Sequence, residues 1–344
     1  MIINMNSLDT AKLTAYLETR IKGFQGPVTA EKFAGGQSNP TFLLKASNGE
    51  YVLRRQPSGT LLNGAHAVDR EYRVLDALRN TDVPVAHAYL LCEDADVIGS
   101  MFYVMSFEQG RIFWDPALPE LSNEQRAPLY SELIRVLATL HDVDVHAVGL
   151  GDYGRSGNYF ERQVSTWTKQ YRAAETETNQ AMETLISWLP ANMPADDGQL
   201  SMIHGDYRID NLIFHSTETR VLAVLDWELS TLGHPLADLA YFSMCLRLPS
   251  TWHIIGLADK NREQLGIPTE TELVAQYCAL RGIEGIENWS FYLAFSFFRL
   301  AAIVQGVLKR ALDGNASSDQ ALQVGKMAGP LAQMAVALLE KEPN

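Results

Sequence analysis

The chain has 344 residues, a hydrophobic fraction of 47%, a charged fraction of 20% and a formal net charge of −13 at pH 7. These proportions are typical of a soluble globular protein, and the length is too great for one small domain. The negative charge argues against nucleic acid as a partner, because nucleic-acid-binding proteins usually present a basic face.

The N-terminal segment predicts a packing helix rather than a targeting signal. A helix capped by Ser7 and ending near Arg20 would present an apolar face of Leu8, Leu13, Tyr16 and Leu17. The segment has no basic region followed by a long apolar block, so we expect no secretory signal. The three cysteines are far apart and fit no metal spacing, which predicts buried thiols in a reducing compartment and a cytoplasmic protein.

A glycine-containing turn and two strands are expected next. The paired glycines in Phe33–Pro40 allow positive φ angles and a close approach of the backbone to a neighbour. Thr41–Lys45 and Tyr51–Arg55 predict strands. Side chains alternate along a strand, so Val52 and Arg54 should lie on the same face of the sheet.

The following segments complete a small N-terminal region. Ala65–Leu78 predicts a helix, and Glu71 shares one face of that helix with two leucines at the spacing i, i+4 and i+7. Val83–Val85 begins a further strand region. Met101–Phe107 predicts the last strand of the region, and Glu108–Gly110 ends it.

The rest of the chain predicts a mainly helical region, which gives an α+β arrangement overall. Phe291–Leu308 is the best candidate for a membrane-spanning helix, but Arg299 in its interior would be costly in lipid. We therefore expect a buried helix and no membrane partner. The predicted helices are Asn123–His141, Tyr159–Ala174, Gln180–Leu189, Pro235–Leu246, Glu270–Arg281, Phe291–Leu312 and Asp319–Glu340.

Polar residues follow two strand-like runs, Ser201–Phe214 and Val221–Glu228. The first run places Asp206 and Asn211 in a loop, and the second is almost wholly apolar until Asp226. A phosphoryl-transfer site requires one carboxylate to accept a hydroxyl proton, and an amide oxygen and a second carboxylate to hold magnesium. Asp and Asn are also common turn formers, but this order of residues in a strand–loop–strand context favours the functional interpretation.

The same stretch resembles a known family. HGDYRIDN, His204–Asn211, has the H-x-D-x-x-x-x-N spacing of the protein-kinase catalytic loop, and DWE, Asp226–Glu228, stands where kinases have DFG. With Gly205 and the run GHPLADLAYF, Gly233–Phe242, the chain resembles the aminoglycoside phosphotransferase branch of the kinase-like proteins. This resemblance implies a protein-kinase-like two-lobe fold. A small antiparallel-sheet lobe at residues 1–107 would bind the nucleotide, and a large helical lobe at residues 108–344 would carry the catalytic loop and the substrate site.

A narrower resemblance lies in YVLRRQPSG, Tyr51–Gly59, and AHAVDREYRVLDAL, Ala65–Leu78. These runs are similar to kinase-like proteins related to the N-terminal domains fused to some acyl-CoA dehydrogenases. The resemblance implies ATP and Mg²⁺ as cofactors and the hydroxyl group of a small molecule as the phosphoryl acceptor. The net charge of −13 is unfavourable for ATP, so cations must offset it at the site.

The resemblance also implies roles for residues of the catalytic stretch. Asp206 is the expected catalytic residue, which accepts the proton of the acceptor hydroxyl. Asn211 and Asp226 are expected to hold Mg²⁺. His204 is expected to support the loop. Asp238 is an acid on an otherwise apolar helix, so it should be buried, paired and bonded to the loop backbone.

The nucleotide is expected to bind to residues of the small lobe. Arg54 replaces the usual lysine that contacts the phosphates, and Glu71 is its expected partner rather than a solvated acid. Val52 is expected to contact adenine, and backbone groups near Met105 and Phe107 are expected to bond to it. The amides expected to cover the phosphates are those of Gly35, Gly36, Gln37, Ser38 and Asn39.

Several acceptor classes are compatible with these patterns. The narrower resemblance favours a hydroxyacyl-CoA or hydroxy acid, whereas the wider one allows an aminoglycoside-like or amino-alcohol acceptor, which an acidic chain could attract. Arg54 in place of lysine also allows a nucleotide-binding pseudokinase. Gly233–Pro235 follows Asp226 too closely for the long activation segment of a protein-directed kinase. A cationic stripe at helical spacing is expected to be a solvated face rather than a phosphate site, and it comprises Arg162, Lys169 and Arg172.

Overall fold

The computed structural model describes residues 8–33, 39–57, 67–155, 157–314 and 320–340. The chain forms two compact units. The first contains residues 1–112, 146–150 and 211–230, and the second contains residues 113–145, 151–210 and 231–344. This grouping differs from two consecutive lobes, because the hairpin after the catalytic loop belongs to the first unit, where the Val224 N–H donates to the Pro84 carbonyl oxygen at 2.9 Å.

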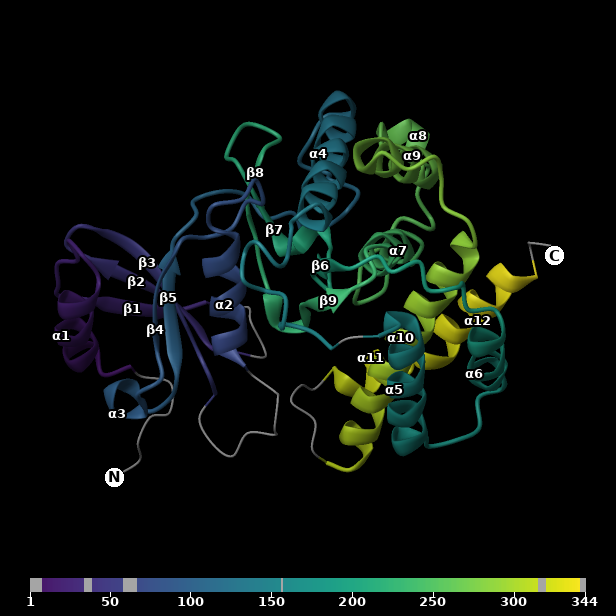
Figure 1. Cartoon of the computed structure of the whole chain (residues 1–344), viewed down its shortest axis with the longest axis horizontal. Coiled ribbons are helices and arrows are strands. Elements are labelled where there is room, and N and C mark those ends of the chain that lie inside the picture. The colour runs from purple at the N-terminus through teal and green to yellow at the C-terminus, as the bar shows by residue number, and fades with distance from the viewer. Residues whose placement is uncertain (1–7, 34–38, 58–66, 156, 315–319, 341–344) are drawn as a thin grey trace. The chain divides into compact units, whose positions relative to one another are not determined.

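The first unit is built on a five-stranded antiparallel sheet in the order β1-β2-β3-β5-β4 (Figure 1). The strands predicted at Thr41–Lys45, Tyr51–Arg55 and Met101–Phe107 are confirmed with shifted ends. The fourth strand begins at Ala88, later than predicted. The strands are β1 (Thr29–Lys32), β2 (Thr41–Ala46), β3 (Gly49–Arg55), β4 (Ala88–Cys92) and β5 (Phe102–Ser106).

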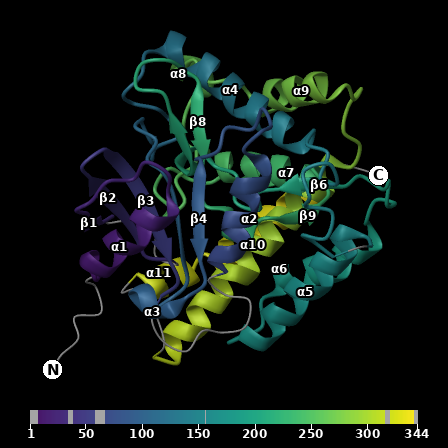
Figure 2. The same ribbon diagram turned by 60° about the vertical axis from the view of Figure 1, so that its left-hand side comes forward.

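Helices of the first unit lie on both faces of this sheet (Figures 1 and 2). Apolar side chains of α1 pack with Leu53 on one face, whereas Glu71 of α2 meets Arg54 on the opposite face. Asp9 caps α1, and the predicted cap, Ser7, lies outside the described residues. The helices are α1 (Thr10–Arg20), α2 (Val68–Leu78) and α3 (Ala95–Ile98).

The residues around the catalytic stretch form two short sheets, where the sequence predicts one hairpin. The apolar runs near residues 201, 212 and 221 are confirmed as strands, and the additional strand is Thr231–Gly233, which pairs with the first of them. The first unit contains β7 and β8, and the second unit contains β6 and β9. Their bounds are β6 (Ser201–Ile203), β7 (Leu212–Phe214), β8 (Val221–Val224) and β9 (Thr231–Gly233).

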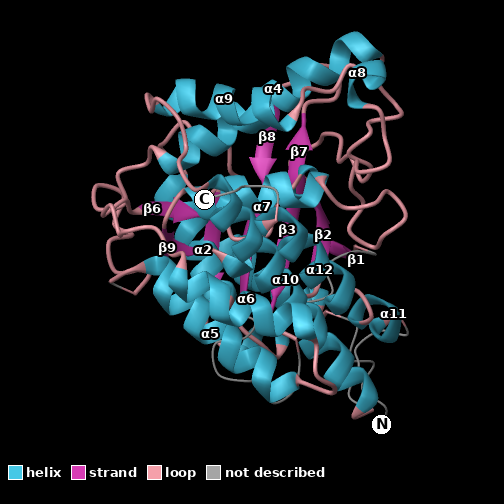
Figure 3. Cartoon of the chain, turned by 90° about the vertical axis from the view of Figure 1, so that its right-hand side faces the viewer, coloured by secondary structure: helices cyan, strands magenta, loops and turns pink. Residues whose placement is uncertain are grey.

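Helices form most of the second unit (Figure 3). The long helix α10 packs against α5, α7, α11 and α12. The predicted bounds of α4 and α9 are confirmed, and each helix begins with a capping box, Ser122 with Gln125 and Thr269 with Glu272. The helices are α4 (Asn123–His141), α5 (Tyr159–Ala174), α6 (Gln180–Ala191), α7 (Leu236–Leu246), α8 (Arg262–Leu265), α9 (Glu270–Arg281), α10 (Trp289–Leu312), α11 (Ala321–Gly325) and α12 (Ala328–Leu339).

The prediction of one helix over Asp319–Glu340 is wrong, because the segment is divided into α11 and α12. The division follows Gly325. A Cβ atom at this glycine would lie 2.4 Å from the Leu308 Cβ of α10, so the glycine permits a close contact between the two helices. Glycine also weakens a helix, and α12 begins at Ala328, after a short turn.

The prediction that α10 is a buried helix is confirmed. Its length and composition alone would allow it to cross a membrane, but 78% of its most apolar 18-residue window is buried inside the described structure. Arg299 lies in the middle of this helix and is itself buried. A helix that is apolar on most sides is typical of the core of a large helical unit.

Candidate active site

The catalytic loop follows β6 in the second unit, and its backbone is bonded to one buried acid. Asp238 accepts hydrogen bonds from the His204 N–H at 2.6 Å and from the Gly205 N–H at 2.8 Å. Gly205 has a φ angle of 85°, a region that glycine adopts without strain. His204 supports the same turn, since its Nδ1 accepts from the Asp206 N–H at 3.2 Å. The predicted structural roles of Asp238 and His204 are therefore confirmed.

Asp238 is bonded in turn to a buried histidine that the sequence did not reveal. His141 Nε2 lies 3.4 Å from Asp238 Oδ2, and His141 Nδ1 lies 2.7 Å from the Tyr277 hydroxyl. Burial raises the pKa of Asp238, but its hydrogen bonds outweigh burial and hold that pKa below its usual value. Burial lowers the pKa of His141, so this imidazole is neutral at neutral pH and can donate one N–H to Asp238.

One face of α7 is directed at the catalytic loop. Asp238, Tyr241 and Cys245 recur on this helix at the spacing i, i+3 and i+7, which places them on one side. Burial, together with the nearby Asp206 carboxylate, raises the pKa of Tyr241 well above its usual value. The helix thus supports the loop backbone through Asp238 and brings Tyr241 close to the Asp206 side chain.

Asp206 also has a cationic neighbour. Arg208 Nε lies 3.4 Å from Asp206 Oδ1, and Arg208 Nη2 lies 2.9 Å from Asp210 Oδ2. Burial lowers the pKa of Arg208, but Asp206 and Asp210 outweigh burial and raise it. The Asp206 side chain is 22% exposed, so a substrate group can reach it. The position of Arg208, two residues after Asp206, was the only signal in the sequence for this contact.

The first unit contains another ionic cluster, the Arg54 cluster, which is formed by Arg54, Glu71 and Asp226. Arg54 Nε lies 2.8 Å from Glu71 Oε2, and Arg54 Nη2 lies 2.7 Å from Asp226 Oδ1. Burial lowers the pKa of Arg54, but the surrounding carboxylates raise it overall. The predicted pairing of Arg54 with Glu71 is therefore confirmed, and Asp226 is a further partner. Glu228 Oε2 lies at 3.7 Å from the same guanidinium.

Glu71 is almost completely buried, with a relative exposure of 1%. Besides Arg54, it accepts hydrogen bonds from Asn39 Nδ2 at 2.8 Å and from the Tyr103 hydroxyl at 3.1 Å. Burial raises its pKa, and Arg54 and these two donors oppose the rise. The side chain of Asn39 therefore has a structural partner in α2. Gly35, Gly36, Gln37 and Ser38, which were expected to cover phosphates, lie outside the described residues.

Asn211 and Asp226 lie at the same end of the β7–β8 hairpin. Leu212 pairs with Val224, and the Leu225 N–H donates to the Asn211 carbonyl oxygen at 2.8 Å. Asp226 has a φ angle of 63°, which is uncommon for a residue with a side chain and indicates a conformation held by its surroundings. An amide oxygen and a carboxylate fit Mg²⁺, which prefers hard oxygen ligands and needs few of them from the protein.

The other residues expected to bind the nucleotide lie on β3 and near the end of β5. Val52 pairs with Met105 in the ladder between these strands, and Phe107 directly follows β5. Val52 lies on the same strand face as Arg54. The structure therefore brings Val52, Met105 and the Arg54 cluster onto one side of the sheet. Within the described residues, no group of three or more His, Cys, Asp or Glu side chains could hold a metal ion.

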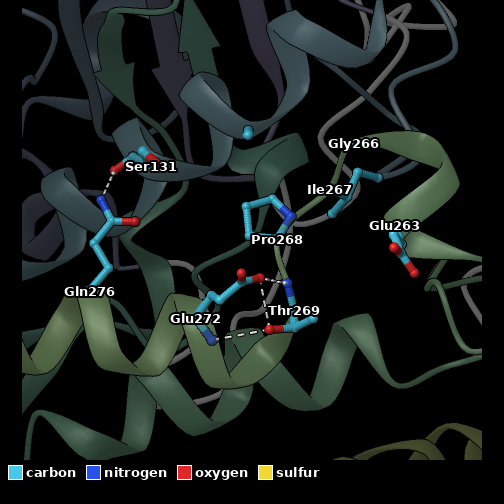
Figure 4. Close-up of a pocket in the computed structure, with 9 residues that line it drawn as sticks. Ser131, Glu263, Gly266, Ile267, Pro268, Thr269, Glu272 and Gln276 are labelled. Atoms are coloured by element: carbon cyan, nitrogen blue, oxygen red, sulfur yellow. Dashed lines mark hydrogen bonds between the residues drawn. The ribbon is translucent and has the colours of Figure 1, made fainter.

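A pocket of about 580 Å³ between α4 and α9 contains none of the predicted site residues (Figure 4). Its polar groups bond to one another. Gln276 Nε2 donates to the Ser131 carbonyl oxygen at 3.1 Å, and Thr269 and Glu272 form the capping box of α9. These internal bonds are typical of a groove between packed helices.

The cationic stripe on α5 has carboxylate and carbonyl partners of its own. Arg172 pairs with Glu175 and Glu183, and the Arg162 guanidinium donates to the Gly157 carbonyl oxygen. The stripe therefore fits the solvated face that the sequence predicts.

Comparisons with known proteins place these features in a family. The sequence model of the phosphotransferase enzyme family, APH, matches residues 29–281. Acyl-CoA dehydrogenase family member 10 from Mus musculus is 48% identical over 332 residues, which make up 95% of this chain and 31% of that protein. The chain thus spans about a third of the length of this relative.

Solved structures agree with the sequence match. The crystal structure of a candidate aminoglycoside phosphotransferase from Ralstonia eutropha is 49% identical with a TM-score of 0.90, and the match covers 98% of this chain and 100% of that one. Aminoglycoside phosphotransferase APH(4)-Ia, in ternary complex with AMP-PNP and hygromycin B, has a TM-score of 0.62 at 14% identity and covers 96% and 99% of the two chains. That similarity shows the fold alone, and the predicted kinase-like α+β fold is confirmed.

Proposed function

The chain belongs to the phosphotransferase enzyme family and is a phosphotransferase with an alcohol group as acceptor, and we propose that it transfers the γ-phosphoryl group of ATP in the presence of Mg²⁺. The observation that carries the proposal is the catalytic loop. Its backbone is held by Asp238, and it presents a partly exposed carboxylate, Asp206, beside a cation. A positioned carboxylate of this kind can accept the proton of an attacking hydroxyl.

In the proposed reaction, the acceptor hydroxyl donates a hydrogen bond to Asp206. As the oxygen–phosphorus bond forms and the bond to ADP breaks, the hydroxyl proton passes to the Asp206 carboxylate. Arg208 and the Tyr241 hydroxyl keep that carboxylate in one orientation before transfer. The products are the phosphorylated acceptor and ADP, and the proton is later released to water.

The Arg54 cluster has the proposed task of binding the phosphates. Arg54 offers a planar fork of N–H donors for phosphate oxygens, while Glu71 fixes its direction. Asn211 and Asp226 would hold Mg²⁺, which when bound neutralises negative charge on the phosphate oxygens. The AMP-PNP in the APH(4)-Ia structure supports the choice of an ATP-type donor for a chain of this fold.

A nucleotide-binding pseudokinase is the alternative that Arg54 suggests. The structure gives this arginine the ion pair expected of the usual lysine, since it contacts Glu71 at 2.8 Å. The candidate base and both candidate metal ligands are also present. These observations favour turnover over nucleotide binding alone.

For the acceptor we propose a hydroxyacyl-CoA or a related hydroxy acid. The support is the 48% identity over nearly the whole chain to acyl-CoA dehydrogenase family member 10, whose name associates the rest of that protein with acyl-CoA compounds. An aminoglycoside acceptor is favoured by the net charge of −13, which could attract a polycation. That charge is a weak criterion, because a long-range field steers ligands without selecting among them.

The test is ADP release by the purified protein with Mg-ATP and acceptors at matched concentrations. We expect turnover with 3-hydroxybutyryl-CoA or a hydroxy acid, and a phosphorylated product by mass spectrometry. The Asp206→Asn variant is the control for contaminating kinases. Efficient turnover of kanamycin, with none of the hydroxyacyl compounds, would reverse the choice of acceptor. Mg-ATP binding without turnover of any acceptor class would favour the pseudokinase.

A further inference from the structure

Arg299 is a buried cation of α10 that the proposed reaction does not use. Its relative exposure is 7%. The guanidinium carbon lies 5.7 Å from the centre of the Trp167 ring and 5.6 Å from the centre of the Tyr241 ring. The side chain is therefore held between α5 and α7. Among the described residues, no carboxylate forms an ion pair with it and no acceptor receives a hydrogen bond from it.

This environment is unusual for a purely structural residue. Burying a charge without a counter-ion is costly, and cation–π contacts with two rings offset only part of that cost. A methionine or leucine could fill the same space without the cost. The nitrogen atoms of Arg299 are not among the fully enclosed polar atoms that lack partners, so the guanidinium retains contact with solvent. The solvent-contacting edge of the guanidinium is the part that an anionic group would meet.

Tyr241 connects this cation with the candidate base. One face of the Tyr241 ring lies against Arg299, and, besides burial, the Asp206 carboxylate is close enough to help raise the pKa of the Tyr241 hydroxyl. All three residues belong to the second unit. A ligand whose hydroxyl meets Asp206 would thus have Arg299 on the other side of Tyr241.

We propose that Arg299 binds an anionic group of the phosphoryl acceptor, a carboxylate or phosphate oxygen, several bonds from the hydroxyl that is phosphorylated. The proposal rests on the proposed phosphotransferase function and specifies the acceptor chemistry. A guanidinium with free N–H groups can form two parallel, charge-assisted hydrogen bonds with such a group. The same cation would repel the ammonium groups of an aminoglycoside, which makes a polycationic acceptor unfavourable at this position.

The experiment compares anionic acceptors with neutral analogues. The probes are 4-hydroxybutyrate and 6-hydroxyhexanoate, each with its primary amide, and 3-hydroxybutyryl-CoA. Arg299→Met removes the charge while filling the space between the two rings. Arg310→Met, on the exposed part of the same helix, is the matched control for a lost positive charge. Melting temperatures of both variants verify folding, and Arg299→Lys tests whether charge alone restores function.

We expect the wild-type protein to prefer a carboxylate over its amide, and Arg299→Met to lose about tenfold to hundredfold in kcat/KM for the anionic acceptor only, mainly through KM. Activity with the amide should stay within about threefold, as should all activities of Arg310→Met. Selective loss with the free acids identifies a carboxylate as the bound group. Selective loss with the CoA ester identifies a phosphate. Equal losses with charged and neutral acceptors, or no loss, would overturn the proposal.

Failure of the proposed function gives a different result. If the wild-type protein phosphorylates none of the probes, the proposed acceptors are wrong, and calorimetric binding of the same probes then tests Arg299 directly. Weaker binding of the anionic probes to Arg299→Met than to the wild type and Arg310→Met would support the anion site. Equal affinities, or no binding of any anionic probe to the wild type, would overturn it.

Discussion

Two buried carboxylates, Glu71 in the first unit and Asp238 in the second, are stabilised in different ways. Each has a relative exposure of 1%. Glu71 lies against the guanidinium of Arg54 and accepts from two further side chains. Asp238 has two backbone N–H donors and a neutral histidine, His141. One acid is balanced by an opposite charge and the other by oriented dipoles.

Because Glu71 and Asp238 are stabilised differently, substitutions near each acid should have different effects. Arg54 also contacts Asp226, so the three residues of the Arg54 cluster depend on one another. In the second unit, Asp238 holds the loop through its backbone, and the Asp206 side chain takes no part in that attachment. We therefore expect substitution of Arg54 or Glu71 to affect stability and catalysis together. Substitution of Asp206 should affect catalysis and leave stability nearly unchanged.

The largest effect is expected for Asp206→Asn. Loss of the proposed proton acceptor should lower turnover by about 10²- to 10⁴-fold, while the melting temperature and the affinity for Mg-ATP stay close to those of the wild type. Steady-state kinetics, thermal unfolding and calorimetry measure the three quantities. Wild-type turnover in the purified variant would falsify the role of Asp206, and a large loss of stability would contradict the independence of the loop.

Substitutions at Arg54 and Glu71 test the acid that is balanced by an opposite charge. Arg54→Met leaves Glu71 buried without its counter-charge, which typically costs about 3–5 kcal/mol. Glu71→Gln should cost less, because Arg54 keeps Asp226 as a partner. The double variant should lose less stability and less activity than the sum of the single losses. Urea unfolding and kcat/KM of the wild type, the two single variants and the double variant form a double-mutant cycle. Strictly additive losses would show that the two residues act independently.

Substitutions of Asp226 and Asn211 test the proposed Mg²⁺ site, whereas those of Arg54 and Glu71 test the ion pair. Asp226→Ala removes the proposed charged ligand, so Mg²⁺-dependent ATP affinity should fall by at least the roughly tenfold to hundredfold seen when a metal site loses a supporting residue. Asn211→Ala should have a smaller effect because the amide is neutral. Calorimetry with and without Mg²⁺ measures both. Unchanged affinity and metal dependence in Asp226→Ala would exclude the metal role.

The smallest effect is expected for His141, which is bonded to Asp238, and concerns the pH dependence of unfolding. The pKa of His141 is lowered in the folded chain by burial, so unfolding allows the imidazole to bind a proton once the pH falls below about 6.5. The free energy of unfolding should therefore decrease from pH 7.5 to 5.5, by on the order of 1 kcal/mol for this group. His141→Gln should make the decrease shallower without abolishing it, because burial also lowers the pKa of His234.

The matched control for this prediction is His253→Gln, at an exposed position. Its unfolding free energy should follow the pH dependence of the wild-type protein. Identical slopes for His141→Gln and the wild type would contradict a lowered pKa of His141 in the folded chain.

The sequence by itself was sufficient for the elements that local interactions determine. Capping boxes begin α4 and α9 at the predicted residues, and strand alternation placed Arg54 on the face where it meets Glu71. The order of His204, Asp206, Asn211 and Asp226, together with Gly205 and the run Gly233–Phe242, was sufficient for the family and the fold. These features depend on backbone geometry and side-chain spacing within a few residues, which a linear pattern records.

Only the tertiary structure showed which distant residues meet. His141 is 97 positions from Asp238, yet the two are bonded, and no spacing in the sequence connects them. Gly325 allows α11 to lie close against Leu308 of α10, a contact that helix propensity does not include. The position of Arg299 between Trp167 and Tyr241 likewise depends on how three helices pack. Such contacts depend on shape and burial in the assembled core, so they are determined only when the whole unit is folded.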